Sequence, residues 1–274
     1  MIVIGNRVVD ANTLKTSGFE SEKNEMIDKM SRYQESYSYL NIQHFEFSLH
    51  LRYAIIQAAR QLLASKARFT TFETARCNEQ FWHLTEQGGF KLKRGINPSV
   101  AISDIFQNGR EYGFECATSI VIIFYKAVLD SIDVAQFNRI FQGLYLRDWQ
   151  SDDDLPIFTR RGNDYLPGDC LYFANPQFNP QTPQWQGENV IDLGNDLYFG
   201  HGIGIKTADG IIESLNKRRK PYATESAYLL SQVTRLDHLY LYRFSSYGPN
   251  RNRVPQFIAS KTIVGKIGSS LYYV

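Results

Sequence analysis

The segment FECATSIVIIFYKAVLD, from Phe114 to Asp130, contains the pattern that decides the fold class. Its centre, Ile120 to Tyr125, is apolar or aromatic throughout, so the segment is expected to form a buried helix with almost no polar face. Glu115 and Cys116 lie in its first turn. Because a helix N-terminus stabilises an anion through its unpaired N–H groups and its dipole, a cysteine at this place can act as a nucleophilic thiolate.

Helical patterns predominate in the first half of the chain. Residues 47–65 have apolar positions at i, i+4 spacing and predict an amphipathic helix, whereas residues 81–93 alternate about a Gly-Gly pair and predict a hairpin. Asn97-Pro98 and Asp133 indicate the starts of two further helices, the first of which ends near Gly109. The polar residues before Leu40 are interpreted as loop and weak helix.

After Pro156 the chain consists of short apolar segments separated by turns, which predicts an antiparallel meander. Helices followed by such a meander indicate an α+β fold, in which the N-terminal helices pack on an antiparallel sheet within a single domain. The expected strands are LPGDCLYF (166–173), ENVIDL (188–193), LYFGHGIGI (197–205), GIIESL (210–215) and HLYLYRF (238–244), with one helix in SAYLLSQVTRL (226–236).

Composition describes an ordinary globular protein: 274 residues, 43% hydrophobic and 21% charged, with a net charge of +2. No run of residues is long and apolar enough for a membrane span, and the first residues do not form a secretory signal. We expect a monomer with no nucleic-acid partner, no membrane partner and no metal. The three cysteines are far apart and form no CxxC pair, which argues against disulfides and zinc and favours a reducing compartment.

A cysteine that opens a buried helix, followed by strands that bear a histidine, is the arrangement of papain-like thiol enzymes. The candidate histidine is His201, which lies between two glycines. Spacing alone does not decide the matter, since Cys116 is equally compatible with an inert core position. The other histidines, His44, His50, His83 and His238, are as eligible as His201 on the same ground.

Longer blocks carry a resemblance. FECATSIVIIFYKA, GDCLYF, NPQFNPQTPQWQGENVI, YFGHGIGI and SAYLLSQ occur in this order between about residues 40 and 244. In these blocks the chain resembles the small protein-glutamine gamma-glutamyltransferases of Bacillus spore coats. The resemblance implies a compact papain-like fold related to the NlpC/P60 enzymes, with no cofactor and no calcium site. It also implies the reaction, in which a protein glutamine forms a cysteine thioester with release of ammonia, and a lysine amine then forms an isopeptide bond.

The resemblance assigns roles to four residues. Cys116 is the nucleophile, Glu188 is its main partner, Glu115 is a second carboxylate that can cover part of that role, and His201 is secondary. A carboxylate acts as a base towards a thiol only where burial raises its pKa or where substrate excludes water. Two alternatives remain open: Glu115 as a partner of the helix dipole, and Glu188 as a charge on an edge strand.

Transfer to an amine must also compete with hydrolysis, because water is abundant and protein lysine is scarce. A dry tunnel lined with aromatic residues is the expected device, although each aromatic residue is also compatible with a place in the core. Cys170 and Cys77 are interpreted as structural. The candidate substrate-binding residues are Phe69, Trp149, Tyr172, Trp185 and Asn189.

Residues 1–244 are expected to form the catalytic domain, and residues 245–274 a basic extension with no counterpart in the shorter family members. The extension has four basic residues and no acidic one, and it is interpreted as a self-substrate or a guide to anionic coat surfaces, with docking as an edge strand as the alternative. The resemblance implies spore coat proteins as substrates, and a location in the mother-cell cytoplasm and then the coat. Two rival functions are an NlpC/P60-type thiol amidase or peptidase that uses Cys116 and His201, and a non-enzymatic coat protein.

Overall fold

The computed structural model describes residues 1–15, 20–246, 263–267 and 270–273. Its centre is a seven-stranded antiparallel sheet with the strand order β13-β12-β11-β10-β15-β9, in which β14 also pairs with β10. This sheet confirms the predicted antiparallel meander of the C-terminal half. Its strands are β9 (Ile157–Arg161), β10 (Cys170–Ala174), β11 (Gly187–Gly194), β12 (Leu197–Gly200), β13 (Gly204–Lys206), β14 (Tyr228–Leu229) and β15 (Gln232–Leu236).

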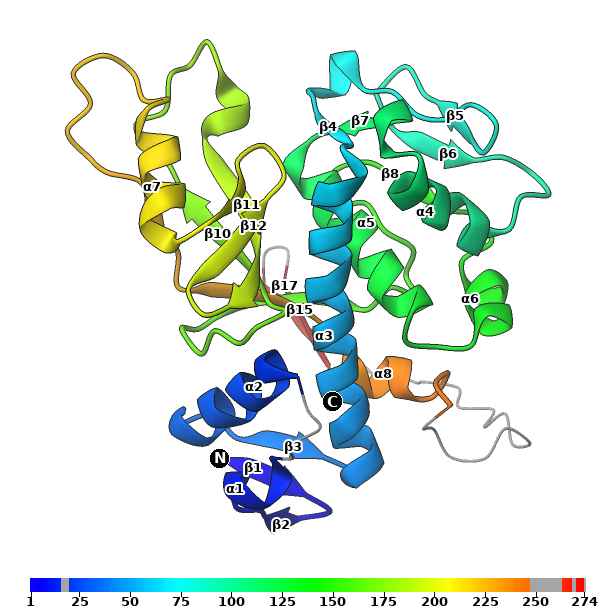
Figure 1. Ribbon diagram of the computed structural model, residues 1–274, viewed down its shortest axis with the longest axis vertical. Coiled ribbons are helices and arrows are strands. Elements are labelled where there is room, and N and C mark those ends of the chain that lie inside the picture. The colour runs from blue at the N-terminus through cyan, green and yellow to red at the C-terminus, as the bar shows by residue number, and fades with distance from the viewer. Residues whose placement is uncertain (16–19, 247–262, 268–269, 274) are drawn as a thin grey trace.

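Helices pack on this sheet around the long α3, which runs upright through the middle of the view in Figure 1. Both α3 and α5 contact β11, and they pack against one another in the main hydrophobic core. The structure therefore has the mixed helix-and-sheet architecture that the sequence predicts. The helices are α1 (Ala11–Leu14), α2 (Ser21–Arg32), α3 (Ile42–Ser65), α4 (Pro98–Gln107), α5 (Cys116–Leu129), α6 (Val134–Ile140), α7 (Ala208–Asn216) and α8 (His238–Tyr242).

The central helix α5 has the boundaries and the burial that its sequence predicts. From Ala117 to Tyr125 each residue is buried, because a helix that is apolar on all sides is stable only when protein surrounds it. The helix ends at the capping residue Asp130, and Lys126 in its last turn pairs with the Asp130 carboxylate. The predicted hairpin and helix starts are also confirmed, since β5 pairs with β6 and helices begin after Asn97 and Asp133.

Short strands complete the two ends of the molecule. β1, β2 and β3 form a small sheet beside α1 and α2, so the residues before Leu40 are more ordered than loop and weak helix. Near the opposite end of α3, β4 pairs with β7 and β6 pairs with both β5 and β8. These strands are β1 (Ile2–Ile4), β2 (Arg7–Val8), β3 (Tyr37–Tyr39), β4 (Arg68–Phe69), β5 (Trp82–Leu84), β6 (Phe90–Leu92), β7 (Gly113–Phe114) and β8 (Tyr145–Leu146).

Two segments have the opposite secondary structure to the predicted one because of helix caps. GIIESL lies in α7 and is not a strand: the Thr207 side chain accepts from Gly210 N, and Ile211 and Leu215 at i, i+4 spacing form the buried face. HLYLYRF lies mostly in α8, because Asp237 accepts from the first amides of that helix. In both cases the capping side chain directly before the segment is the decisive local signal.

The third difference concerns SAYLLSQVTRL, which forms β14 and β15 and not a helix. β15 lies between β9 and β10, and Val233 and Thr234 are buried there. A β-branched pair suits a strand with neighbours on both sides, and this packing decides the conformation of the segment.

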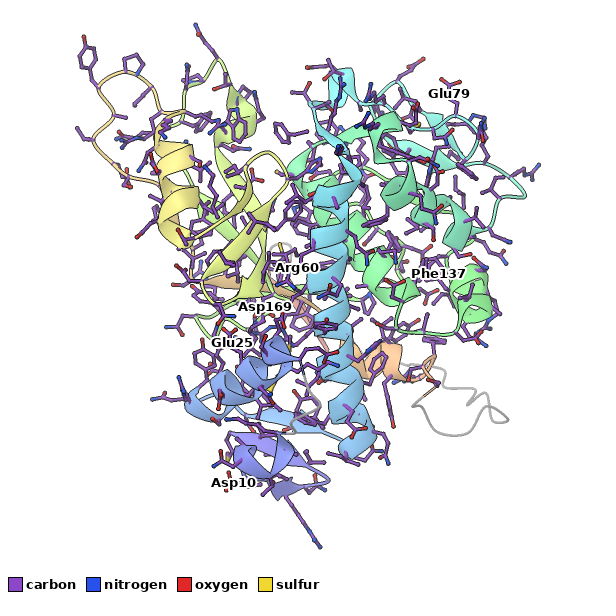
Figure 2. The ribbon with its side chains drawn as sticks, viewed as in Figure 1. Asp10, Glu25, Arg60, Glu79, Phe137 and Asp169 are labelled. Carbon is purple, nitrogen blue, oxygen red and sulfur yellow. The ribbon has the colours of Figure 1, made fainter. Side chains whose placement is uncertain are left out.

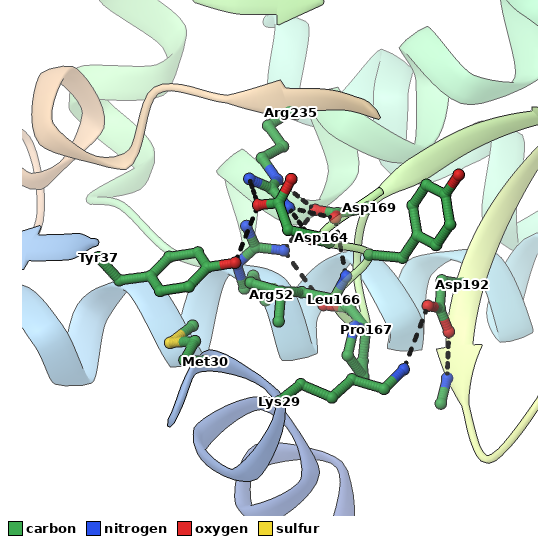
Figure 3. A network of polar contacts seen from close by, with 12 residues as sticks. Lys29, Met30, Tyr37, Arg52, Asp164, Leu166, Pro167, Asp169, Asp192 and Arg235 are labelled. Carbon is green, nitrogen blue, oxygen red and sulfur yellow. Dashed lines mark hydrogen bonds and ion pairs between the residues drawn. The ribbon is translucent and has the colours of Figure 1, made fainter. Parts of the chain in front are cut away.

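A buried polar network ties the sheet to α3 and to the N-terminal strands (Figure 3). Arg235 on β15 donates to both oxygens of Asp169 at 2.7 and 2.8 Å, and Arg52 on α3 donates to the same carboxylate at 2.6 Å. Tyr37 on β3 donates to Asp164, which also accepts from Arg235. Asp169 lies where the sheet meets α3 (Figure 2), so the network fixes the sheet relative to the helices that position the site.

In the C-terminal extension, β16 (Ile263–Ile267) and β17 (Ser270–Tyr273) pair with one another in antiparallel fashion. Within the described part of the chain neither strand pairs with the seven-stranded sheet, so the edge-strand alternative has no support. The other expectations for the extension concern residues 247–262, which lie outside the described residues.

Candidate active site

Cys116 is the first residue of α5, and the residue before it is the cap of that helix. The Glu115 carboxylate accepts from Ala117 N, Thr118 N and the Thr118 hydroxyl, each at 2.6 Å. These are amides that a helix N-terminus otherwise offers to an anion. The first-turn amides of Ala117 and Thr118 are therefore occupied by Glu115 and do not face the sulfur as free donors.

A cleft of about 750 Å³ opens at Cys116. Both Glu115 and Cys116 line it, together with four of the five predicted substrate-binding residues, Phe69, Trp149, Tyr172 and Asn189. Sequence reasoning did not find several other residues of its walls. Those that matter below are Thr71, Phe72, Glu73, Ala117, Asp148, Gln184, Gln186 and Gln232.

Glu188 and Asn189 are adjacent on β11, and their side chains have different surroundings. Asn189 lines the cleft, and its Nδ2 donates to Cys116 Sγ at 3.7 Å. Glu188 is fully buried: its Oε1 accepts from Gly202 N at 3.4 Å, and its Oε2 has no partner among the described residues. A side chain at Gly200 would collide with this carboxyl group, so the glycine before His201 makes room for Glu188.

Burial dominates the protonation of this pair. It raises the pKa of Glu188 to about 8, and the charge of Glu115 adds to the shift against the lowering effect of the Gly202 amide. It also raises the pKa of the Cys116 thiol well above its ordinary value, and the negative charges of Glu188 and Glu115 act in the same direction. The resting site therefore holds a neutral thiol next to a carboxyl group that titrates near neutrality.

His201 has a different environment from that of a catalytic base. Its Nε2 contacts the Arg68 carbonyl at 3.2 Å, and its ring stacks on Phe114 with 4.7 Å between centroids. Burial lowers the pKa of His201 to about 4, so the ring is neutral at physiological pH. His201 does not appear in the cleft wall, whereas Phe69, whose ring meets it edge-on at 6.0 Å, does.

Trp185 lies behind the cleft wall. Its ring packs on Phe69 at 5.1 Å between centroids, and the Arg218 guanidinium lies 3.7 Å from the ring centre on it. A side chain at Gly202 would collide with both Trp185 and Phe69, which explains the second glycine beside His201. Of the predicted aromatic residues, Phe69, Trp149 and Tyr172 thus form the wall, and Trp185 supports it.

The remaining candidates lie elsewhere. Cys170 is buried on β10, and burial raises the pKa of Cys77 to about 12. His44 and His238 contact each other at 2.7 Å. Across the described ranges, no three His, Cys, Asp or Glu side chains come together as a metal site, and no helix has the length and apolar character needed to cross a membrane.

The cysteine-helix, the facing antiparallel sheet and the buried carboxyl group define a thiol-dependent acyl-transfer class of site. The family model of the protein-glutamine gamma-glutamyltransferases matches residues 1–245. The chain belongs to this family, and it is an acyltransferase that acts on protein glutamine. The resemblance seen in the sequence is thereby confirmed.

Individual relatives agree with this assignment. The protein-glutamine gamma-glutamyltransferase of Bacillus cereus strain B4264 is 47% identical over 247 residues, 90% of each chain. That of strain AH820 is 44% identical over 277 residues, 98% of this chain and 99% of its own, so it carries a counterpart of most of the C-terminal extension. A solved transglutaminase of Geobacillus stearothermophilus, described as lacking its C-terminal extension, is 55% identical with a TM-score of 0.73 and covers 75% of this chain and 99% of its own.

Proposed function

We propose that the cleft is the active site and that Cys116 forms a thioester with the side chain of a protein glutamine. The observation that carries the proposal is the position of Cys116 Sγ in the cleft, beside the Asn189 amide and near a fully buried carboxyl group of raised pKa. Cys116 is the only one of the three cysteines in this wall.

In the first half-reaction Glu188, in its carboxylate form, accepts the thiol proton as the sulfur attacks the glutamine carbonyl. The Cys116 amide and Asn189 Nδ2 are the donors available to the oxyanion. The C–N bond then breaks, and the proton held by Glu188 leaves with the nitrogen as ammonia. In the second half-reaction a lysine amine attacks the thioester and gives its proton to Glu188, the C–S bond breaks, and the proton returns to the sulfur.

Glu115 and His201 act in this scheme through position. Glu115 caps the nucleophile helix with three hydrogen bonds, which favours the dipole-partner interpretation over that of a spare proton acceptor. His201 joins the Arg68 carbonyl of β4 to the ring of Phe114 and so braces the wall that carries Phe69.

The walls suit the two substrates. Gln184, Gln186 and Gln232 offer neutral amides to a glutamine-bearing segment. The charged residues that line the cleft, Glu73, Glu115 and Asp148, are acidic, and an acidic cleft favours the approach of a lysine ammonium group.

The finer parts of the proposal rest on the resemblance. We infer a papain-like fold related to NlpC/P60 enzymes, supported by the packing of the cysteine-helix α5 against β11 of an antiparallel sheet. Spore coat proteins are the proposed substrates, with activity in the mother-cell cytoplasm and then in the coat, carried out by a monomer without calcium or a cofactor.

The test of the function is incorporation of a fluorescent primary amine into casein, with excess calcium and with a chelator of divalent metals. The expected result is equal labelling in both conditions, because the proposed steps use only side chains and backbone amides of this chain. Loss of labelling in the chelator would contradict the calcium-free mechanism, and absence of labelling in both would contradict the cleft chemistry for such substrates.

The pH dependence should follow Glu188. Below its pKa of about 8 the carboxyl group is protonated and cannot accept the thiol proton. We therefore expect kcat/KM for a glutamine peptide to rise about tenfold per pH unit towards pH 8 and then to level off. A flat profile between pH 6 and 8 would contradict this assignment.

The same shift has a sign in stability. The unfolded chain releases the Glu188 proton near pH 4.5, whereas the native protein keeps it until about pH 8. Native stability is therefore lost as pH rises through this window. Glu188→Gln lacks the titration, so its melting temperature should exceed that of the wild type by a margin that grows from pH 5 to pH 8.

A further inference from the structure

Trp149 stands in the cleft wall on a tight turn, residues 147–150. The turn is closed by a hydrogen bond from Gln150 N to the Arg147 carbonyl at 3.0 Å, and Asp148 and Trp149 are its central residues. Asp148 has a φ of 52°, in the left-handed region that residues other than glycine seldom adopt. Contacts outside the turn must therefore fix the conformation that places Trp149.

One of these contacts comes from the nucleophile helix itself. Thr118 is 2% exposed, and its Oγ1 accepts from Asp148 N at 2.8 Å while donating to Glu115 Oε1 at 2.6 Å. A single buried hydroxyl group thus connects the Trp149 turn to the cap of the helix that begins at Cys116. Neither half of this connection is available to a valine of nearly the same shape.

We propose that Thr118 is a positioning residue that holds the Trp149 wall over the Cys116 thioester and thereby favours the amine over water. This inference rests on the proposed function of the cleft. The thioester has two fates: attack by the lysine nitrogen gives an isopeptide, and attack by a water oxygen gives glutamate. In both, the C–S bond breaks and the proton of the nucleophile ends on the sulfur, so the ratio of the two products reports how well water is excluded.

The chain offers a matched control on the same helix. The hydroxyl group of Tyr125, which is fully buried on α5, accepts from Asp152 N at 2.8 Å. Tyr125→Phe removes an α5 hydroxyl that anchors the same connecting segment, as Thr118→Val does, but the lost contact lies outside the 147–150 turn. A general loss of stability should therefore affect both variants, and a loss of wall position should affect only Thr118→Val.

The experiment measures ammonia release and amine incorporation together, with one glutamine peptide and a fixed concentration of a primary amine. For Thr118→Val we expect the hydrolysed share of the released acyl groups to rise about two- to tenfold, the range set by loss of one ordinary hydrogen bond. Thr118→Ser, which keeps the hydroxyl group, should restore the wild-type share, and Tyr125→Phe should leave it unchanged.

Trp149→Ala provides a second route if Thr118→Val does not fold, because Trp149 is 38% exposed and its truncation leaves the core intact. It should raise the hydrolysed share at least as much. The proposal is overturned if a folded Thr118→Val retains the wild-type share, if Tyr125→Phe shifts it equally, or if Trp149→Ala does not change it. Failure of the proposed function is distinct, since the wild-type protein would then release no ammonia from the peptide.

Discussion

Cys116→Ala should abolish incorporation of a primary amine into casein, with a loss of about 10⁴-fold or more. The thioester requires a nucleophile at the start of α5, and the cleft wall contains no second thiol that could replace it. Initial rates of fluorescent amine incorporation at pH 8 measure the effect.

Two variants of the other cysteines serve as controls. Cys77→Ser and Cys170→Ala should retain most of the activity, because neither residue lines the cleft. The Cys116 assignment would be contradicted by substantial activity in Cys116→Ala, or by loss of activity in a folded Cys77→Ser protein.

Glu188→Gln should reduce kcat/KM by about 10²- to 10⁴-fold, the contribution usual for a general base. Glutamine keeps the volume and the acceptor oxygen of the buried side chain, so the effect isolates proton transfer. His201→Gln should cost about tenfold or less, because the His201 ring is neutral and contacts a backbone carbonyl and not the substrate cleft.

Steady-state kinetics with one glutamine peptide compare the two variants directly. The pH profile offers an independent readout, since the rise towards pH 8 should disappear in Glu188→Gln and remain in His201→Gln. A fully active Glu188→Gln together with an inactive His201→Gln would indicate a Cys-His enzyme of the NlpC/P60 kind.

Local patterns predicted the parts of the fold that depend on local patterns. The all-apolar segment after Cys116 became the buried α5, and the alternating residues around Gly88-Gly89 became the hairpin of β5 and β6. Prediction failed after residue 206, where apolar residues fit both periods. There the caps Thr207 and Asp237 produce helices, and the gap between β9 and β10 makes β15 a strand.

The site shows the same division. The first turn of α5 was evident from sequence, but the engagement of its amides by Glu115 was not, because Glu115 was considered as a possible base. The wall residues Phe69 and Trp149 came from resemblance and not from pattern. The bond between Thr118 and Asp148 joins residues 30 positions apart and leaves no local signal in the chain.

Intact-protein mass spectrometry of the acyl-enzyme tests the central claim most directly. The protein is mixed with a short glutamine peptide in the absence of any amine, quenched in acid and weighed, then digested to locate the adduct. The predicted result is one adduct of the peptide mass less one ammonia, located on Cys116, released by hydroxylamine and absent from Cys116→Ala. A turnover-competent protein that carries this adduct on another residue, or forms none under any quench, would contradict the mechanism.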